Sequence, residues 1–96
     1  MAEPDYLLSV TTAATGDAVT IHGDRQGLEL LREKIDVLLA GLVAGECDHR
    51  HLRSDAWAGF ELSTSMLESE RDAGHRIVHH LEVLAWTPDW KLKHGL

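Results

Sequence analysis

The chain is organised around one stretch, GDRQGLELLREKIDVLLAGLVAG, which runs from Gly23 to Gly45. Leucine and isoleucine recur in it every three or four residues, the spacing that gathers side chains on one face of a helix. Asp24 is a favourable N-cap, and a glycine is a natural C-terminal stop. The stretch therefore predicts a helix from Arg25 to Val43 or Ala44. Its predicted apolar face comprises Leu28, Leu31, Ile35, Leu38, Leu39 and Leu42.

Strand patterns lie on both sides of this helix. Alternating residues over Tyr6–Thr11 and Val19–His22, separated by the turn residues Gly16 and Asp17, predict a β-hairpin. Further strands are expected after the helix, over Cys47–Arg53, Gly59–Ser63 and Arg76–Trp86. The stretch 64–74 is either a loop or a short helix over Leu67–Ala73, and residues 87–96 are expected to form a loosely ordered C-terminal tail.

The order ββαβββ predicts one domain of the α+β class over residues 1–96, an antiparallel sheet of about five strands with the long amphipathic helix on one face. One helix covers one face, so the other face is open to water or to a partner. The side chains expected to face the helix are Val19, Ile21, Leu52, Phe60, Leu62, Ile77, Leu81 and Val83. Period-two alternation then places on the open face His22, His49, His51, Glu61, His80 and Glu82.

Three interpretations of the open face stay open. In the first, His49 and His51 bind zinc together with His80, or with Glu61 or Glu82 in its place. In the second, the face binds a protein partner through His49, His51, Glu61, His80, Glu82 and Trp86. In the third, the histidines are solvated and have no assigned task. His79 shares a face with apolar residues and is expected to be buried or half-buried with its ring nitrogens bonded.

Composition narrows the function classes. The 96 residues carry a formal net charge of −7, which argues against binding nucleic acid through its phosphates. The single cysteine, Cys47, excludes an intrachain disulfide and suits a reducing compartment. The acidic N-terminus does not resemble a secretory signal, and the longest apolar run, Val37–Ala44, is too short to cross a bilayer. We therefore expect a cytoplasmic protein without a membrane partner.

Motifs of enzymes are missing from the sequence. It contains no phosphate-binding loop, no G-x-S-x-G elbow and no H-E-x-x-H helix. A chain of this length also offers little depth for a pocket that excludes water. The sequence therefore favours a protein that is not an enzyme and that has no cofactor, with zinc as the alternative.

Three short motifs together are similar to a known family. They are GDRQGLELL at Gly23–Leu31, DHRHL at Asp48–Leu52 and GFEL at Gly59–Leu62. Over Thr20–Trp86 the chain resembles the immunity protein 32 family of bacterial polymorphic toxin systems. The resemblance implies an antitoxin that neutralises a cognate protein toxin by direct binding, without enzyme activity. It supplies no catalytic or metal-binding residues that can be carried over to this chain.

The charge adds to what the resemblance implies. An acidic protein is steered toward a basic partner, and toxins that cut nucleic acid are often basic because their substrate is a polyanion. A basic nuclease is therefore one candidate for the toxin. The alternatives from other classes are a small histidine-rich zinc-binding domain and a homodimeric interaction module.

Overall fold

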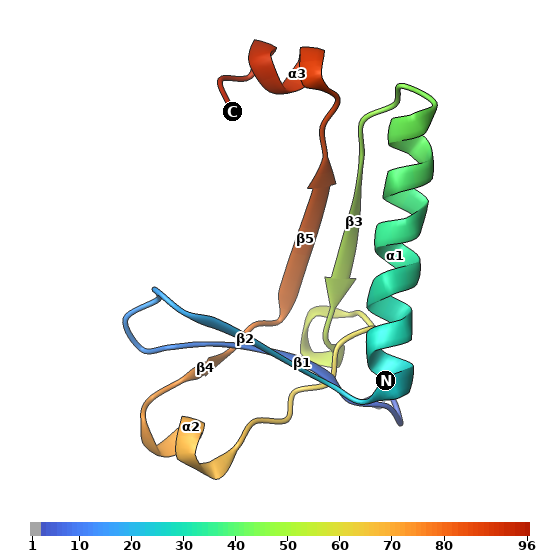
Figure 1. The fold of residues 1–96 in the computed structure, drawn as a ribbon. Helices are drawn as coiled ribbons and strands as arrows, with labels where there is room; N and C mark the ends of the chain where they lie inside the picture. Colours follow the sequence, from blue (N-terminus) through green and yellow to red (C-terminus); the bar gives the residue numbers. More distant parts are fainter. Residues whose placement is uncertain (1–2) are drawn as a thin grey trace.

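A computed structural model describes residues 3–96, which form five strands and four helical segments (Figure 1). The strands are β1 (Leu8–Thr12), β2 (Val19–Gly23), β3 (Asp48–Arg53), β4 (Arg76–Ile77) and β5 (His80–Ala85). The helices are α1 (Arg25–Val43), α2 (Glu68–Asp72) and α3 (Pro88–Lys93), with a 3₁₀ helix, η1 (Asp55–Trp57). The α+β class, the antiparallel pairing and the single long helix are confirmed.

Helix α1 has the predicted bounds, and its N-cap also ties it to the first strand. Asp24 Oδ1 accepts a hydrogen bond from the Gly27 amide at 2.8 Å, and Asp24 Oδ2 accepts one from the Leu7 amide at 2.9 Å. These two bonds favour the ionised carboxylate and lower the pKa of Asp24. The helix ends at Val43, just before Gly45, which has a φ of 78°. Within residues 3–96, no helix is long and apolar enough to span a membrane.

The five strands divide between two sheets instead of forming one. A three-stranded sheet has the order β2-β1-β4, and β3 pairs with β5 in a two-stranded ribbon. The expected strand 76–86 breaks between Ile77 and His80, because the Val78 amide donates to the Val10 carbonyl while the Ser54 amide donates to the His79 carbonyl. The chain thus crosses from one sheet to the other within two residues. The alternating pattern of the sequence continues across this break and does not reveal it, although Val78 and Leu81, which the pattern places on opposite faces, both pack against the core.

The expected strand over Gly59–Ser63 is wrong. Its only ladder contact is an isolated parallel bridge between Ser54 and Leu62. The chain turns sharply at Ala58, which has a φ of 60°, and the amides of Glu61 and Leu62 then both donate to the Arg53 carbonyl. In a β-ladder, successive amides do not donate to the same carbonyl, so this segment cannot continue as a paired strand. Leu62 is fully buried, but Phe60, which was expected beside it, is 64% exposed.

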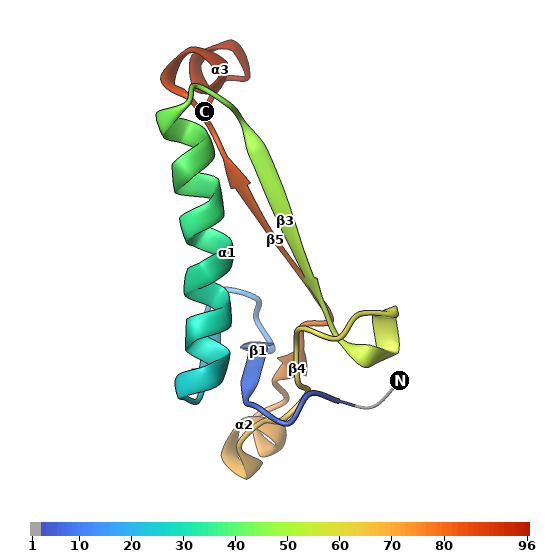
Figure 2. The ribbon, with the colours of Figure 1, turned by 90° about the vertical axis from the view of Figure 1, so that its right-hand side faces the viewer.

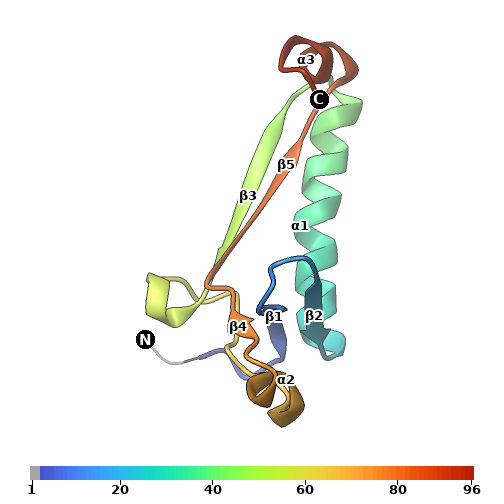
Figure 3. The same ribbon diagram turned by 90° about the vertical axis from the view of Figure 1, so that its left-hand side faces the viewer.

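The two stretches with the weakest patterns both contain short helices. Of the two alternatives for residues 64–74, the structure has the helix, as α2. Within the stretch predicted as a tail, α3 begins after Thr87, whose hydroxyl accepts a hydrogen bond from the Trp90 amide at 3.4 Å. Figure 3 shows α2 beside β1 and β4, and α3 at the opposite end of the molecule.

The apolar face of α1 is only partly covered. Leu38 is buried, whereas Leu28, Ile35 and Leu39 are exposed, contrary to the sequence-based expectation. Helix α1 runs along the ribbon and not across a broad sheet (Figures 1 and 2). Two strands about 4.8 Å apart are too narrow to cover an apolar stripe that is 100° or more wide. Val19 and Ile21 are exposed as well, on β2, one of the two edge strands of its sheet.

The hydrophobic core lies where the two sheets and α1 meet. Leu8 and Val10 of β1 pack there with Leu52 of β3 and with Leu62. From this junction the ribbon and α1 extend together to α3 (Figure 2). The molecule measures 44 × 29 × 23 Å, and its radius of gyration of 15.1 Å exceeds the roughly 12.5 Å typical of a compact chain of this length. The fold therefore leaves one side of the ribbon open along its length.

Candidate functional site

The open side of the ribbon gathers histidines and a carboxylate. The pairing register places His51 opposite Glu82, and it places His49 opposite Leu84 on the same side. The alternate residues Leu52 and Leu81 belong to the buried side, in the core with α1. We call the open side the ribbon face. Its residues are His49, His51, Arg53, His80, Glu82 and Leu84.

Short contacts join three of these side chains. His51 Nδ1 and His80 Nε2 share a hydrogen bond of 2.6 Å, and their rings stack with centroids 4.9 Å apart. A bond between two imidazole nitrogens requires one of them to carry the proton and the other to accept it. The other nitrogen of His51, Nε2, lies 3.5 Å from Glu82 Oε2. His51 is therefore held between a neighbouring ring and a carboxylate.

One group on the ribbon face brings together three side chains that could hold a metal ion. His49, His51 and Glu82 each offer one ligand atom, and these atoms all lie within 4.8 Å of one another. The rings of His49 and His51 meet edge to face with centroids 4.8 Å apart. Of the three candidates that the sequence offered as a third ligand, Glu82 lies directly opposite His51 in the ladder and belongs to this group. His80 Nε2 is hydrogen-bonded to His51, and Glu61 lies outside the ribbon.

Tryptophans mark both ends of the ribbon face. Trp57 of η1 stacks against His80, with ring centroids 6.2 Å apart. At the other end, Trp86 is half-buried and its ring lies 5.1 Å from that of His94. A hollow of about 150 Å³ connects this end to the ribbon face, and Trp86, His49 and Leu84 help to line it. Trp57 was not predicted here, because only the turn after β3 brings it beside β5.

Glu61 does not belong to the ribbon face, contrary to prediction. The segment that contains it is no strand, so alternation does not apply to it. Its Oε2 accepts a hydrogen bond from the Phe60 amide at 2.8 Å, and the Tyr6 hydroxyl donates to its carbonyl at 2.9 Å. Burial and the nearby Glu61 carboxylate both raise the pKa of Tyr6. Glu61 therefore takes part in contacts with the N-terminal segment.

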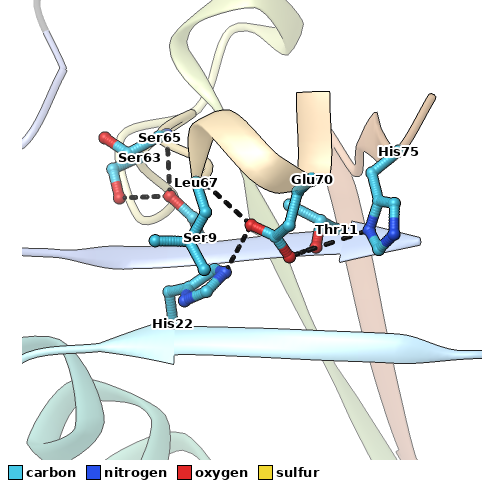
Figure 4. A network of polar contacts seen from close by, with 8 residues as sticks. All are labelled: Ser9, Thr11, His22, Ser63, Ser65, Leu67, Glu70 and His75. Carbon is cyan, nitrogen blue, oxygen red and sulfur yellow. Dashed lines mark hydrogen bonds and ion pairs between the residues drawn. The ribbon is translucent and has the colours of Figure 1, made fainter. Parts of the chain in front are cut away.

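His22 lies apart from the other histidines, which also corrects the predicted open face. It belongs to β2 in the three-stranded sheet, and α2 covers that side of the sheet (Figure 4). Glu70 of α2 accepts hydrogen bonds from Thr11 Oγ1 at 2.9 Å and from the Leu67 amide at 2.8 Å, and it contacts His22 Nε2 at 2.8 Å. These bonds, the Leu67 amide first, lower the pKa of Glu70. We call this group the Glu70 cluster and assign it a structural role.

Serine hydroxyls extend the same layer of polar contacts. Ser9 Oγ and Ser63 Oγ lie 2.8 Å apart, and Ser9 Oγ also accepts the Ser65 amide at 2.9 Å (Figure 4). A second pair, Ser54 Oγ and His79 Nδ1, lies 2.7 Å apart, so His79 is half-buried as predicted and one of its two ring nitrogens is bonded. Ser9 and Ser54 are both fully buried, so neither hydroxyl is accessible to a substrate. These contacts stabilise the fold.

The fold and the ribbon face define a small acidic α+β protein with an exposed, histidine-rich surface. The sequence model of the family described as immunity protein 32 matches residues 18–81, from the start of the hairpin's second strand into β5. The chain belongs to the immunity protein 32 family, which confirms the resemblance and assigns the chain an immunity role. No curated protein and no solved structure matches the chain.

Proposed function

We propose that this protein acts in the cytoplasm as an antitoxin, without enzyme activity, and that it neutralises a cognate toxin by binding it directly. Membership of the immunity protein 32 family supports the role. The ribbon face is the proposed contact surface, and the observation that carries this assignment is its exposure along the side of β3 and β5 away from the core. Leu84 is 49% exposed there, between tryptophans at either end.

The chemistry of the ribbon face suits a protein interface. Aromatic residues are enriched in the centres of interfaces, and they gain most when a partner excludes water from them. Histidine rings and Leu84 offer an apolar and hydrogen-bonding surface, while Glu82 offers a negative charge. Trp86 extends the proposed contact, and Glu61 lies outside it.

The net charge of −7 supports a basic toxin as the partner. Long-range attraction between opposite charges raises the association rate, and added salt weakens it. A nuclease toxin has a positive surface for its polyanionic substrate. An acidic immunity protein that covers this surface would also exclude the substrate.

The test compares two exposed leucines that are changed in the same way. Leu84→Lys alters the ribbon face, and the matched control Leu39→Lys alters α1, where Leu39 is 53% exposed. Binding to the toxin domain encoded beside the gene is measured by calorimetry, and protection by co-expression in cells. We expect Leu84→Lys to weaken binding about tenfold or more, the size of a loss at the centre of an interface, and Leu39→Lys to have little effect.

Two other results would each contradict part of the proposal. Equal weakening by both variants would mean that only total charge matters, and loss with Leu39→Lys alone would move the contact to α1. Absence of any complex between the wild-type protein and that toxin would remove the proposed partner.

A further inference from the structure

We propose that His49, His51 and Glu82 form a zinc site on the ribbon face. This inference goes beyond the antitoxin function and does not depend on it, because it concerns the isolated protein. It rests on the pairing register, on the hydrogen bond to His51 and on the ligand types.

The ribbon holds the three ligands in a defined arrangement. His49 and His51 occupy successive same-side positions of β3, and Glu82 is paired with His51 across the ladder. Directly paired side chains begin about 5 Å apart, so the register brings all three together without a flexible loop. Their ligand atoms lie within 4.8 Å of one another.

The distances are close to those that zinc requires. Zinc–ligand bonds of about 2.0–2.2 Å in a tetrahedral site hold the ligand atoms roughly 3.4 Å apart. His51 Nε2 and Glu82 Oε2 are already 3.5 Å apart. Only His49, an exposed side chain, has to adjust its rotamer. Zinc binding therefore needs no change in the strands.

His80 orients the central ligand. When His51 Nδ1 carries its ring proton, it donates to His80 Nε2 at 2.6 Å, and Nε2 of His51, 3.5 Å from Glu82 Oε2, is left unprotonated and able to bind a metal. Histidines that bind metals usually donate their second ring nitrogen in this way, which fixes the tautomer and the ring orientation. Trp57 also stacks on His80, with ring centroids 6.2 Å apart. His80 is thus a positioning residue for the site.

The ligand set suits zinc and other first-row transition metals better than magnesium or calcium. Two imidazoles and one carboxylate suit zinc, whereas magnesium and calcium prefer oxygen ligands. Three protein ligands leave a fourth zinc position for water or for another ligand. That position faces solvent, since His49 and Glu82 are both exposed.

The test measures zinc binding to the full chain after treatment with a chelator. Calorimetry with zinc chloride near neutral pH should give one zinc ion per chain, and cobalt in its place should give the visible absorption of a tetrahedral site. We expect His49→Gln and Glu82→Gln to weaken zinc binding at least tenfold. His80→Gln should weaken it about 10–100-fold, the range for a residue that orients a ligand. The matched control, His94→Gln, changes an exposed histidine of the C-terminal segment and should leave binding intact.

Folding of each variant is checked by circular dichroism, and zinc should raise the melting temperature only where the site is intact. Absence of zinc binding to the wild-type protein would overturn the inference. Binding that survives His49→Gln and Glu82→Gln, or that is lost with His94→Gln, would overturn it too, because the ion would then lie elsewhere. Toxin binding by the zinc-free protein is measured separately, so failure here leaves the antitoxin proposal standing.

Discussion

At the scale of single residues, the motif GDRQGL at Gly23–Leu28 has a physical explanation in contacts between α1 and β1. A Cβ atom on Gly27 would lie 1.8 Å from the Leu7 carbonyl oxygen, and a Cβ atom on Gly23 would lie 2.6 Å from the Leu28 side chain. Asp24 between them binds the amides of Gly27 and Leu7. The motif thus specifies how closely the helix approaches the first strand.

We expect Gly27→Ala to destabilise the protein by about 1–3 kcal/mol, since the added methyl group must displace backbone and not a flexible side chain. The matched control is Gly41→Ala in the same helix, where the nearest atom is 3.8 Å from the added Cβ. That variant should be neutral or more stable by up to about 1 kcal/mol, because alanine favours the helix. Urea unfolding measures both. Equal effects of the two substitutions would contradict the close approach at Leu7.

Glu70 makes the stability of the fold depend on pH. Its pKa is lowered from the ordinary value of 4.5, so the unfolded chain takes up a proton at a higher pH than the folded chain does. The stabilisation is complete above pH 4.5 and is lost as the pH falls through the lower pKa of the folded state. We expect Glu70→Gln to reduce the steepness of this acid loss in unfolding experiments. If stability fell equally steeply with pH in both proteins, the Glu70 cluster would not contribute to acid unfolding.

At the scale of elements, the segment after η1 carries one core residue without being a strand. Leu62 is fully buried beside Leu8 and Leu52, whereas Phe60 is 64% exposed. Alternation had placed Phe60 and Leu62 on the same inner side. The chain turns here, and the amides of Glu61 and Leu62 both donate to the Arg53 carbonyl. As a result, only Leu62 reaches the core.

Leu62→Ala should therefore cost about 2–5 kcal/mol, from lost burial and the cavity left behind. Phe60→Ala should change the free energy of unfolding by roughly 0.5 kcal/mol or less, as is usual for a surface residue. Chemical denaturation of both variants tests the difference. A large loss with Phe60→Ala would favour the strand that the pattern predicted over the turn described above.

At the scale of the whole molecule, stability should be uneven along its length. The fully buried apolar side chains Leu8, Val10, Leu52 and Leu62 all lie at the junction of the two sheets. A two-stranded ribbon is at best marginally stable by itself, so the far part of β3 and β5 depends on packing against α1. We call this far part of β3 and β5, together with the end of α1 that packs on it, the arm. The ribbon face lies on the arm and is therefore expected to be less stable than the junction.

Native-state hydrogen exchange should show this gradient directly. We expect the slowest exchange in β1, which is paired on both sides, and faster exchange in β3 and β5 toward α3. The physical reason is that local opening of the ribbon exposes little buried apolar surface. Uniform protection of all strands would instead indicate that the arm and the junction unfold as one unit.

The sequence alone determined those features that depend on local backbone geometry. The bounds of α1, the first hairpin and the shared side of His49 and His51 follow from periods of 3.6 and 2 within one segment. Tertiary structure alone decided the break after Ile77, the cover of α2 over His22 and the place of Glu82 opposite His51. Each of these depends on which distant segments pair and which surfaces they bury, and local alternation is unchanged by that choice.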